Sequence, residues 1–234
     1  MEDRLSLRLG LLKCDPRPVE AMYAAWLPDA GWTVYDVFSG QLPASPSECD
    51  GWVGTGSRFS VYDDEAWIRN YAQLVRDLHA AQAPFAGVCF SHQMLGHALG
   101  GRTAKSPNGW CTGVHQFDVW ETADWMVPPL ARFGLVMSCQ DQVLEPPPGT
   151  RVLAGNDQCP AGMIQIGSML GMQGHPEFTP EYGESLMLAR REVIGEERVR
   201  AAQATLRDPR HAAEVGGWVR NFFRVHSGQE MDRK

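Results

Sequence analysis

Short apolar runs alternate with longer amphipathic patterns through the first hundred of the chain's 234 residues. Short apolar runs predict buried strands, whereas apolar residues at spacings of three and four predict helices with one buried face. We expect strands at residues 5–12, 32–38, 51–54 and 84–88, and helices at residues 18–27, 63–82 and 91–99. Parallel strands need such crossovers, so the alternation predicts an α/β fold with a mostly parallel sheet and helices on both faces.

The pattern changes after Gly100, where glycine and proline separate short strand candidates. These predict a small antiparallel addition to the sheet. They span residues 102–104, 114–120, 135–138, 152–155, 163–166 and 170–173. Helical patterns return at residues 182–193, 196–206 and 211–224, before a polar tail of ten residues. We see no repeat or linker, so we expect one domain over residues 1–234, with residues 180–225 as a helical C-terminal extension.

The chain is acidic, with a formal net charge of −7 and only three lysines. A nucleic-acid surface needs a basic stripe, so we expect no nucleic-acid partner. The first apolar run is interrupted by Arg8 and has no basic start, so no signal peptide is predicted. Residues 158–176 form a long stretch without Asp, Glu, Lys or Arg, but their glycines and polar residues exclude a membrane span. We expect a cytoplasmic protein.

Six cysteines are spread along the chain without an export signal. Reduced thiols are therefore the better interpretation than a disulfide framework. The sequence contains no Cys-x-x-Cys pair and no His-Glu-x-x-His run, and we expect neither a metal nor an organic cofactor.

The strongest local signal is a cysteine between a strand and a helix. The apolar strand ends at Val88, Cys89 follows at once, and a helical pattern begins directly after it. This order is typical of a nucleophile elbow, in which a tight turn presents the nucleophile at the top of the sheet. The helix amino terminus would favour a thiolate, the N–H of Phe90 would bind a developing oxyanion, and Gly87 would leave the turn uncrowded. Taken alone, a small structural cysteine is the commoner explanation.

A cysteine hydrolase also needs a base and a group that orients it. His92 and His97 lie on the helix after the elbow, so we expect packing or supporting roles for them. His175 is the better candidate because Pro176 keeps it extended, which puts Glu177 on the same face. The carboxylate would hold one imidazole tautomer and stabilise the imidazolium. Taken alone, the segment could equally be a loop with a chance carboxylate.

A glycine-rich segment follows the predicted strand at residues 51–54. Its loop, which contains Gly54 and Gly56, would lie at the same carboxyl edge as Cys89 and supply a second oxyanion donor. Phe59 occupies the third position of a Gly-x-Gly-x-x-Gly pattern, so a nucleotide site has little support. A plain glycine-rich turn is the alternative.

Together these segments resemble the class I, or triad, glutamine amidotransferases, in particular the stand-alone members similar to the glutaminase domain of GMP synthetase. Gly-Val-Cys-Phe-Ser-His-Gln resembles the family's elbow, His-Pro-Glu its base and orienting residue, and Gly-Thr-Gly-Ser its oxyanion strand. The resemblance extends from about Leu5 to about Arg191 and implies the three-layer, flavodoxin-like fold of that family. The helices after Pro180 resemble the C-terminal extension of the stand-alone subgroup.

The resemblance implies roles for individual residues. Cys89 would be the nucleophile, His175 the base and Glu177 the orienting residue. The oxyanion hole would be formed by the backbone of Gly56, Ser57 and Phe90. Contacts with the glutamyl group would come from Gln93 and from the stretch at residues 138–141, including Ser138 and Gln140.

Two positions depart from the family pattern. Ser91 stands where most members have Gly, and Cys139 stands where many have His. The first is expected to narrow the elbow, and the second to alter a contact near the substrate or a partner. An anionic glutamyl group in an acidic chain would also need local positive potential from N–H groups and from arginines such as Arg58.

The hypothesis for function is thiolate attack on a γ-glutamyl amide, which gives a glutamyl-thioester that water hydrolyses. The substrate would be a small γ-glutamyl molecule, either glutamine or a γ-glutamyl conjugate. One alternative is a glutaminase subunit that delivers ammonia to a separate synthetase chain, since no pyrophosphatase loop is present. Another is a non-catalytic binding protein on the same fold, and a third is a redox or chaperone-like cysteine protein. The oligomeric state is left open.

Overall fold

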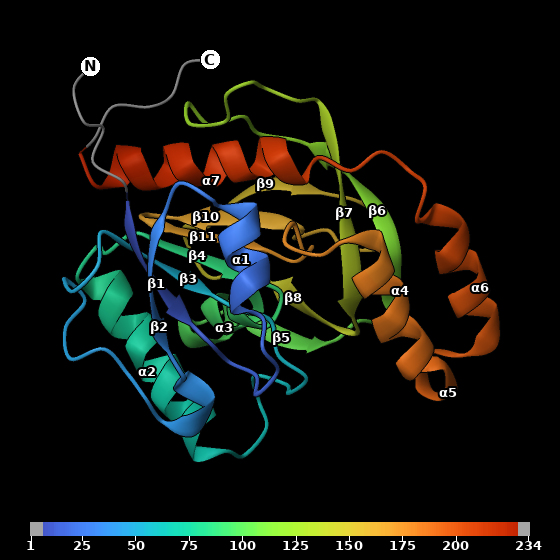
Figure 1. Ribbon diagram of the computed structural model, residues 1–234, viewed down its shortest axis with the longest axis horizontal. Helices are drawn as coiled ribbons and strands as arrows, with labels where there is room; N and C mark the ends of the chain where they lie inside the picture. The colour runs from blue at the N-terminus through green and yellow to red at the C-terminus, as the bar shows by residue number, and fades with distance from the viewer. Residues whose placement is uncertain (1–6, 229–234) are drawn as a thin grey trace.

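The computed structural model describes residues 7–228, and their central feature is a nine-stranded sheet (Figure 1). Its strand order is β2-β1-β3-β4-β11-β10-β9-β6-β7. The neighbours from β2 to β11 pair in parallel, and those from β11 to β7 pair in antiparallel fashion. The parallel strands are β1 (Arg8–Leu12), β2 (Gly31–Tyr35), β3 (Gly51–Gly54), β4 (Phe85–Val88) and β11 (Met169–Met172).

The antiparallel half follows β11 in the sheet. It consists of β6 (Cys111–Val119), β7 (Arg132–Cys139), β9 (Arg151–Gly155) and β10 (Met163–Ile166). Two further strands, β5 (Arg102–Lys105) and β8 (Asp141–Glu145), pair with each other in a separate small sheet. The predicted fold class, a mostly parallel sheet with an antiparallel addition, is confirmed.

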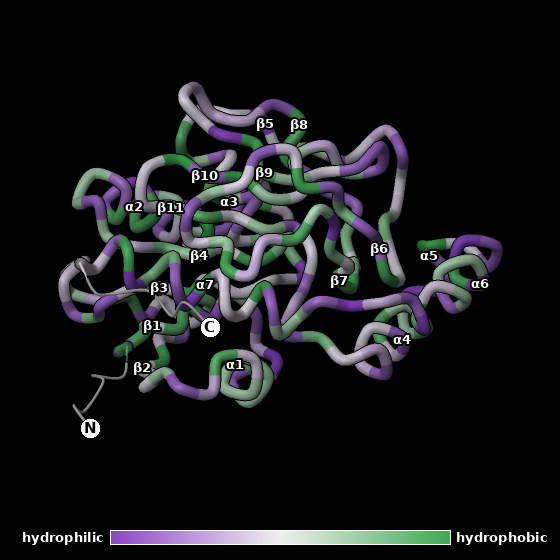
Figure 2. Tube along the Cα trace, turned by 90° about the horizontal axis from the view of Figure 1, so that it is seen from above, coloured by the Kyte–Doolittle hydropathy of each residue, from purple (hydrophilic) through white to green (hydrophobic). Residues whose placement is uncertain are grey.

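Helices cover both faces of the sheet (Figure 1). On one face lie α1 (Glu20–Trp26) and α7 (Ala212–His226), joined by a hydrogen bond from the Trp26 indole N–H to the Ala212 carbonyl. On the other lie α2 (Ala66–Ala80) and α3 (Phe90–Ala98). The remaining helices are α4 (Pro180–Ala189), α5 (Arg191–Ile194) and α6 (Glu196–Thr205). They lie beside β6 and β7, as Figures 1 and 2 both show.

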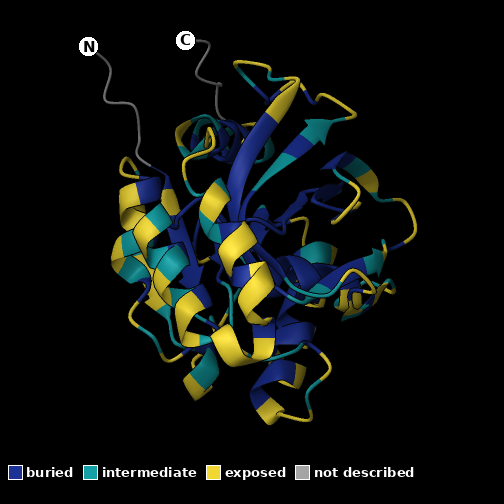
Figure 3. Ribbon diagram, turned by 90° about the vertical axis from the view of Figure 1, so that its right-hand side faces the viewer, coloured by how far each residue is buried: buried dark blue, intermediate teal, exposed yellow. Residues whose placement is uncertain are grey.

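Successive residues of the central strands point into opposite cores. Val53 and Ala86 pack under α1 and α7, while Trp52 and Phe85 pack under α2 and α3. This alternation is the expected consequence of the two-residue period of a strand. Because both faces are covered, β3, β4 and β11 are buried at every position, as Figure 3 shows for the interior of the sheet. The apolar runs that predicted these strands follow from that burial.

The register of the parallel strands decides where the candidate site lies. Gly54 is paired with Gly87, and Met172 with Val88, so β3, β4 and β11 end at the same edge. The chain leaves these three strands into the glycine-rich loop, the cysteine turn and the His-Pro-Glu segment, respectively. The fold therefore gathers three segments that are far apart in sequence.

Several predicted elements differ from the structure. The strand predicted to Phe38 ends at Tyr35, because the Asp36 carboxylate accepts a hydrogen bond from Ser39 N–H and caps a short 3-10 helix, η1 (Val37–Ser39). The strand predicted at residues 170–173 pairs in parallel with β4 and does not belong to the antiparallel addition. β8 was not predicted.

The C-terminal region also differs in detail. The helix predicted at residues 182–193 is divided at Arg190, whose N–H bonds the Met187 carbonyl three residues back and so tightens the last turn. The last helix continues to His226, so the polar tail begins later than predicted. Residues 5 and 6 of the first predicted strand, and residues 229–234 of the tail, lie outside the described residues.

Within residues 7–228, no helix is both long and apolar enough to cross a membrane.

Candidate active site

Cys89 occupies a strained turn between β4 and α3. Its φ of 50° and ψ of −102° lie outside the usual regions for a non-glycine residue. The turn is held from both sides, because Cys89 N–H donates to the Met172 carbonyl at 2.9 Å and the Cys89 carbonyl accepts from Gln93 N–H at 2.9 Å. The thiol is therefore fixed at the carboxyl edge of the sheet.

Close packing beneath the turn explains the glycine two residues before the cysteine. A Cβ atom on Gly87 would lie 2.7 Å from the backbone carbonyl of Ser91 and 2.9 Å from His92 N. Backbone atoms of α3 cannot yield as a flexible side chain could, so this position excludes a side chain. Because residue 87 is a glycine, the first turn of α3 has room to begin directly after Cys89.

His175 and Glu177 meet as a buried pair next to Cys89. His175 Nδ1 lies 2.8 Å from Glu177 Oε1, and the two side chains are only 5% and 1% exposed. His175 N–H donates to the Val136 carbonyl at 2.8 Å, which fixes the backbone of the segment on β7. With Nδ1 on the carboxylate, the other ring nitrogen is left for Cys89, which lines the same hollow as His175.

The charge state of His175 follows from its two neighbours. Burial disfavours the imidazolium, but the negative charges of Glu177 and Cys89 outweigh burial and raise the pKa of His175 to about 10. The imidazole therefore holds its proton at neutral pH, ready to be transferred.

Two neighbours also limit the movement of the imidazole ring. Phe178 stacks on it with ring centroids 3.9 Å apart and an angle of 7° between planes. On the side of the glycine-rich loop, a Cβ atom on Gly56 would come within 2.9 Å of His175 Cε1. The ring has little room to turn away from Cys89.

Tyr23, on α1, makes a contact that the sequence did not reveal. Its buried hydroxyl donates to Glu177 Oε1 at 3.0 Å, the same oxygen that faces His175. Burial and the charge of Glu177 raise the pKa of Tyr23 well above its ordinary value, so the phenol stays a donor. No local motif marks this residue, because it lies 154 positions from its partner.

The predicted oxyanion loop is tied to the elbow by side-chain hydrogen bonds. Ser91 Oγ donates to the Thr55 carbonyl at 2.7 Å, and Thr55 Oγ1 donates to the Gly56 carbonyl at 3.0 Å. Phe90 is the first residue of α3, so its N–H has no carbonyl partner within the helix. The structure thus brings Gly56, Ser57 and Phe90 to the same edge as the thiol.

A hollow of about 310 Å³ opens on one side of Cys89. Its lining includes all three residues that were predicted to contact a glutamyl group: Gln93, Ser138 and Gln140. Gln93 is held by a hydrogen bond from its amide nitrogen to the Asp141 carbonyl at 2.6 Å. Arg58, expected to supply positive potential, lines this hollow as well.

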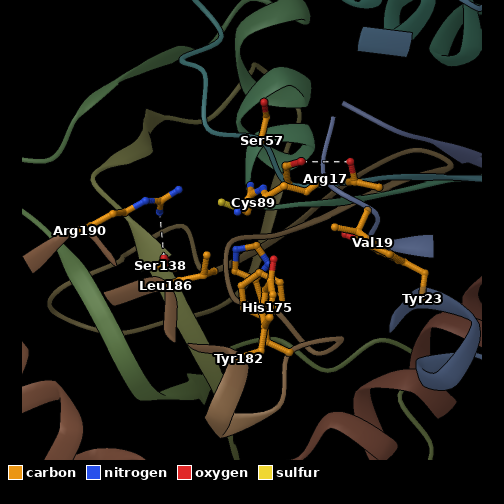
Figure 4. Close-up of a pocket in the computed structure, with 13 residues that line it drawn as sticks. Arg17, Val19, Tyr23, Ser57, Cys89, Ser138, His175, Tyr182, Leu186 and Arg190 are labelled. Atoms are coloured by element: carbon orange, nitrogen blue, oxygen red, sulfur yellow. Dashed lines mark hydrogen bonds between the residues drawn. The ribbon is translucent and has the colours of Figure 1, made fainter. Parts of the chain in front are cut away.

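A second, smaller hollow lies on the His175 side of Cys89 (Figure 4). It encloses about 20 Å³, which is room for about one water-sized group. Tyr182 and Leu186, both from α4, contribute to its wall. Cys89 therefore stands where a larger and a smaller hollow meet.

The other histidines considered from the sequence do not reach the thiol. His92 is buried against Gly171, where burial lowers its pKa to about 3 and leaves it neutral. His97 is exposed on the last turn of α3. Within the described part of the chain, no cluster of three or more metal-ligating side chains occurs.

Comparison with known proteins identifies the family. The family model for glutamine amidotransferase class-I matches residues 54–193, more than half of the chain. The chain belongs to the class I glutamine amidotransferase family. The resemblance stated from the motifs is thereby confirmed, including the likeness to GMP synthetase proteins.

Relatives in this family include both peptidases and synthases. Gamma-glutamyl peptidase 5 from Arabidopsis thaliana is 30% identical over 161 residues, which are 64% of this chain and 63% of that protein. The match thus spans less than two thirds of the peptidase. A glutamine-hydrolysing GMP synthase from Pyrobaculum aerophilum is 29% identical over 145 residues, which are 58% of this chain and 26% of the synthase.

A solved structure supports the fold of this chain. A glutamine amidotransferase from Thermotoga maritima superposes with a TM-score of 0.76 at 16% identity, covering 95% of this chain and 98% of that chain.

The two departures from the family pattern have clear structural settings. Ser91 accepts a hydrogen bond from the Tyr71 hydroxyl at 2.8 Å and donates one to the Thr55 carbonyl. It therefore links α2, the elbow and the glycine-rich loop. Cys139 lines the larger hollow, and burial, followed by the nearby charge of Cys89, raises its pKa well above the ordinary value. A neutral thiol therefore stands at the position where the family resemblance implied an imidazole.

The Tyr23 contact predicts a kinetic effect. Tyr23→Phe removes one of two donors on Glu177 Oε1, so we expect kcat on a γ-glutamyl amide to fall by about tenfold. KM should stay within about twofold, because the substitution removes only a hydroxyl that is hydrogen-bonded to Glu177. Tyr35→Phe removes a comparable hydroxyl–carboxylate bond to Glu48, far from the site, and should leave kcat unchanged. An equal loss in the two variants would contradict the positioning role of Tyr23.

The raised pKa of His175 predicts a pH dependence. Because the folded value is about 10 and the ordinary value about 6.5, the pair stabilises the fold fully below about pH 6.5. That stabilisation is lost as the pH rises through about 10. An NMR titration should show a charged His175 at pH 8, and Glu177→Gln should lower its midpoint by at least about one pH unit.

Glu181→Gln is the matched control for this titration, because Glu181 is an exposed carboxylate at the start of α4. It should leave the His175 midpoint unchanged. A wild-type midpoint near 6.5 would refute the assigned electrostatics.

Proposed function

We propose that the protein hydrolyses the γ-glutamyl amide bond of a small molecule, with Cys89 as nucleophile, His175 as acid and base, and Glu177 as the residue that orients His175. The observation that carries this proposal is the buried imidazole between a carboxylate and a strained elbow thiol. This is the arrangement that cysteine-dependent acyl transfer requires.

Acylation would begin with attack of the Cys89 thiolate on the amide carbonyl carbon. The carbonyl oxygen would gain negative charge and be held by the N–H groups of Phe90 and of the Gly56–Ser57 peptide. When the carbon–nitrogen bond breaks, the proton of His175 would pass to the nitrogen, which leaves as an amine. A glutamyl-thioester would remain on Cys89.

Deacylation would reverse these roles. His175, now neutral, would take a proton from water, and the resulting hydroxide would attack the thioester carbon. The carbon–sulfur bond would break, releasing glutamate and restoring the thiolate–imidazolium pair. Glu177 would keep Nδ1 protonated through both steps, with Tyr23 holding the carboxylate.

The larger hollow supports a glutamyl group on the acyl side. Gln93, Ser138 and Gln140 would contact that group, and Arg58 would supply positive potential for its carboxylate. A reducing, cytoplasmic location is part of the proposal, because the mechanism needs a free thiol.

A second candidate function is a glutaminase subunit that delivers ammonia to a separate synthetase chain. The GMP synthases among the relatives favour it, as does the small volume of the hollow beside His175. A non-catalytic binding protein on the same fold is less well supported, because Cys89, His175 and Glu177 are all present.

Glutamate release separates these functions. The purified protein should release glutamate from at least one member of a panel containing glutamine and γ-glutamyl amides, and Cys89→Ala should be inactive on all of them. Cys159→Ala, which removes a buried thiol outside both hollows, is the matched control and should retain activity. Activity on glutamine that appears only after a synthetase is added would favour the subunit. Equal inertness of wild type and Cys89→Ala would refute catalysis.

A further inference from the structure

The two hollows at Cys89 can be assigned to the two halves of a substrate, if the proposed function holds. The leaving nitrogen takes its proton from His175, so it must lie on the His175 side. His175 lines only the smaller hollow, whereas Gln93 lines only the larger one. The smaller hollow is therefore the amine side, and the larger hollow is the acyl side.

Arg17 belongs to the amine side and is held in a fixed orientation. It lines the smaller hollow but not the larger one. Its Nε lies 2.6 Å from Asp15 Oδ1 and its Nη2 lies 3.0 Å from Asp15 Oδ2. This bidentate interaction leaves Nη1 available. The guanidinium is about one quarter exposed, so it lies near the mouth of the hollow.

Asp15 does not neutralise both of the guanidinium groups that it binds. The carboxylate is fully buried and also binds Arg58, 3.3 Å away. Burial alone would raise its pKa, but Arg17 and Arg58 hold the pKa of Asp15 well below its usual range. Two guanidinium groups on one carboxylate leave one net positive charge beside Cys89.

Arg190, at the end of α4, adds a second charge. It borders both hollows, donates from Nη1 to Ser138 Oγ at 3.2 Å and lies over the Trp110 ring at 5.8 Å. Among the residues described by the structure, it forms no ion pair with a carboxylate. Burial and the nearby charge of Arg17 lower the pKa of Arg190. Figure 4 shows Arg190 and Arg17 on either side of Cys89.

Two like charges facing one small hollow repel each other, and an anion between them would remove that repulsion. We infer that Arg190, together with Arg17, binds a carboxylate carried by the amine half of the substrate. Only the leaving nitrogen and its neighbouring atoms would fit the enclosed 20 Å³, so the carboxylate would lie at the mouth. Ammonia, the amine of glutamine, has no such group.

Arg190 is then a residue that determines specificity. The preferred leaving group is an amino acid or a peptide, because these carry the carboxylate. γ-Glutamyl-alanine and γ-glutamyl-ethylamide test it directly, because the two substrates differ only in the carboxylate of the amine half. Wild-type kcat/KM should be at least about tenfold higher for γ-glutamyl-alanine, which corresponds to one charge-assisted hydrogen-bond contact.

Arg190→Gln should remove this preference. Its kcat/KM on γ-glutamyl-alanine should fall by about tenfold or more, chiefly through KM, and by clearly less on γ-glutamyl-ethylamide, so that the ratio of the two values falls toward one. Arg190→Lys should be intermediate, because an ammonium keeps the charge but not the planar geometry. Arg191→Gln is the control: Arg191 is the next residue, is exposed, pairs with Glu196 and should behave like wild type.

Failure of this inference can be distinguished from failure of the proposed function. Equal wild-type kcat/KM on the two amides, or an equal loss on both in Arg190→Gln, would overturn the inference while leaving γ-glutamyl hydrolysis intact. Failure of wild type to release glutamate from any γ-glutamyl amide would instead refute the proposed function, and the inference with it. Thermal unfolding of each variant separates a loss of folding from a loss of recognition.

Discussion

The left-handed backbone at Cys89 is the constraint on which the arrangement of the site depends. Such a conformation costs on the order of 1–3 kcal/mol for a residue with a side chain, so the surroundings must impose it. Here β4 ends against β11 and α3 begins at once, and hydrogen bonds to Met172 and Gln93 hold the turn. Gly87 supplies the close approach between strand and helix. The strain is thus maintained by the packing of the whole central sheet.

The site also depends on buried charged groups. The chain is acidic overall, yet its carboxyl edge gathers Arg17, Arg58 and Arg190 around the thiol. Asp15 fixes two of these guanidinium groups, and Glu177 fixes the imidazolium, so each buried acid acts by holding a cation in place. An acidic protein can in this way offer local positive potential to an anionic substrate.

Local patterns predicted much of the fold and the centre of the site. β3 and β10 were predicted at their observed bounds, because buried strands read as short apolar runs. Cys89 and the pair His175–Glu177 could be singled out because each lies in a short motif. Their roles stay predictions, although the structure brings them together.

Long-range contacts explain what the sequence could not reveal. β8 has polar residues at both ends and is a strand only because β5 pairs with it. Tyr23 reaches Glu177 from α1, and Arg190 reaches the two hollows beside Cys89 from the break after α4, with no motif to mark either. Such contacts depend on how the elements pack, which periodicity alone does not encode.

The most direct test of the central claim is to trap the acyl-enzyme. The protein would be mixed with a γ-glutamyl amide, quenched in acid within one turnover, and mapped by peptide mass spectrometry. We expect one added glutamyl group on the Cys89 peptide, bound through a linkage that hydroxylamine cleaves as a thioester, and none in Cys89→Ala. A glutamyl group on another cysteine, or glutamate release by Cys89→Ala at the wild-type rate, would contradict it.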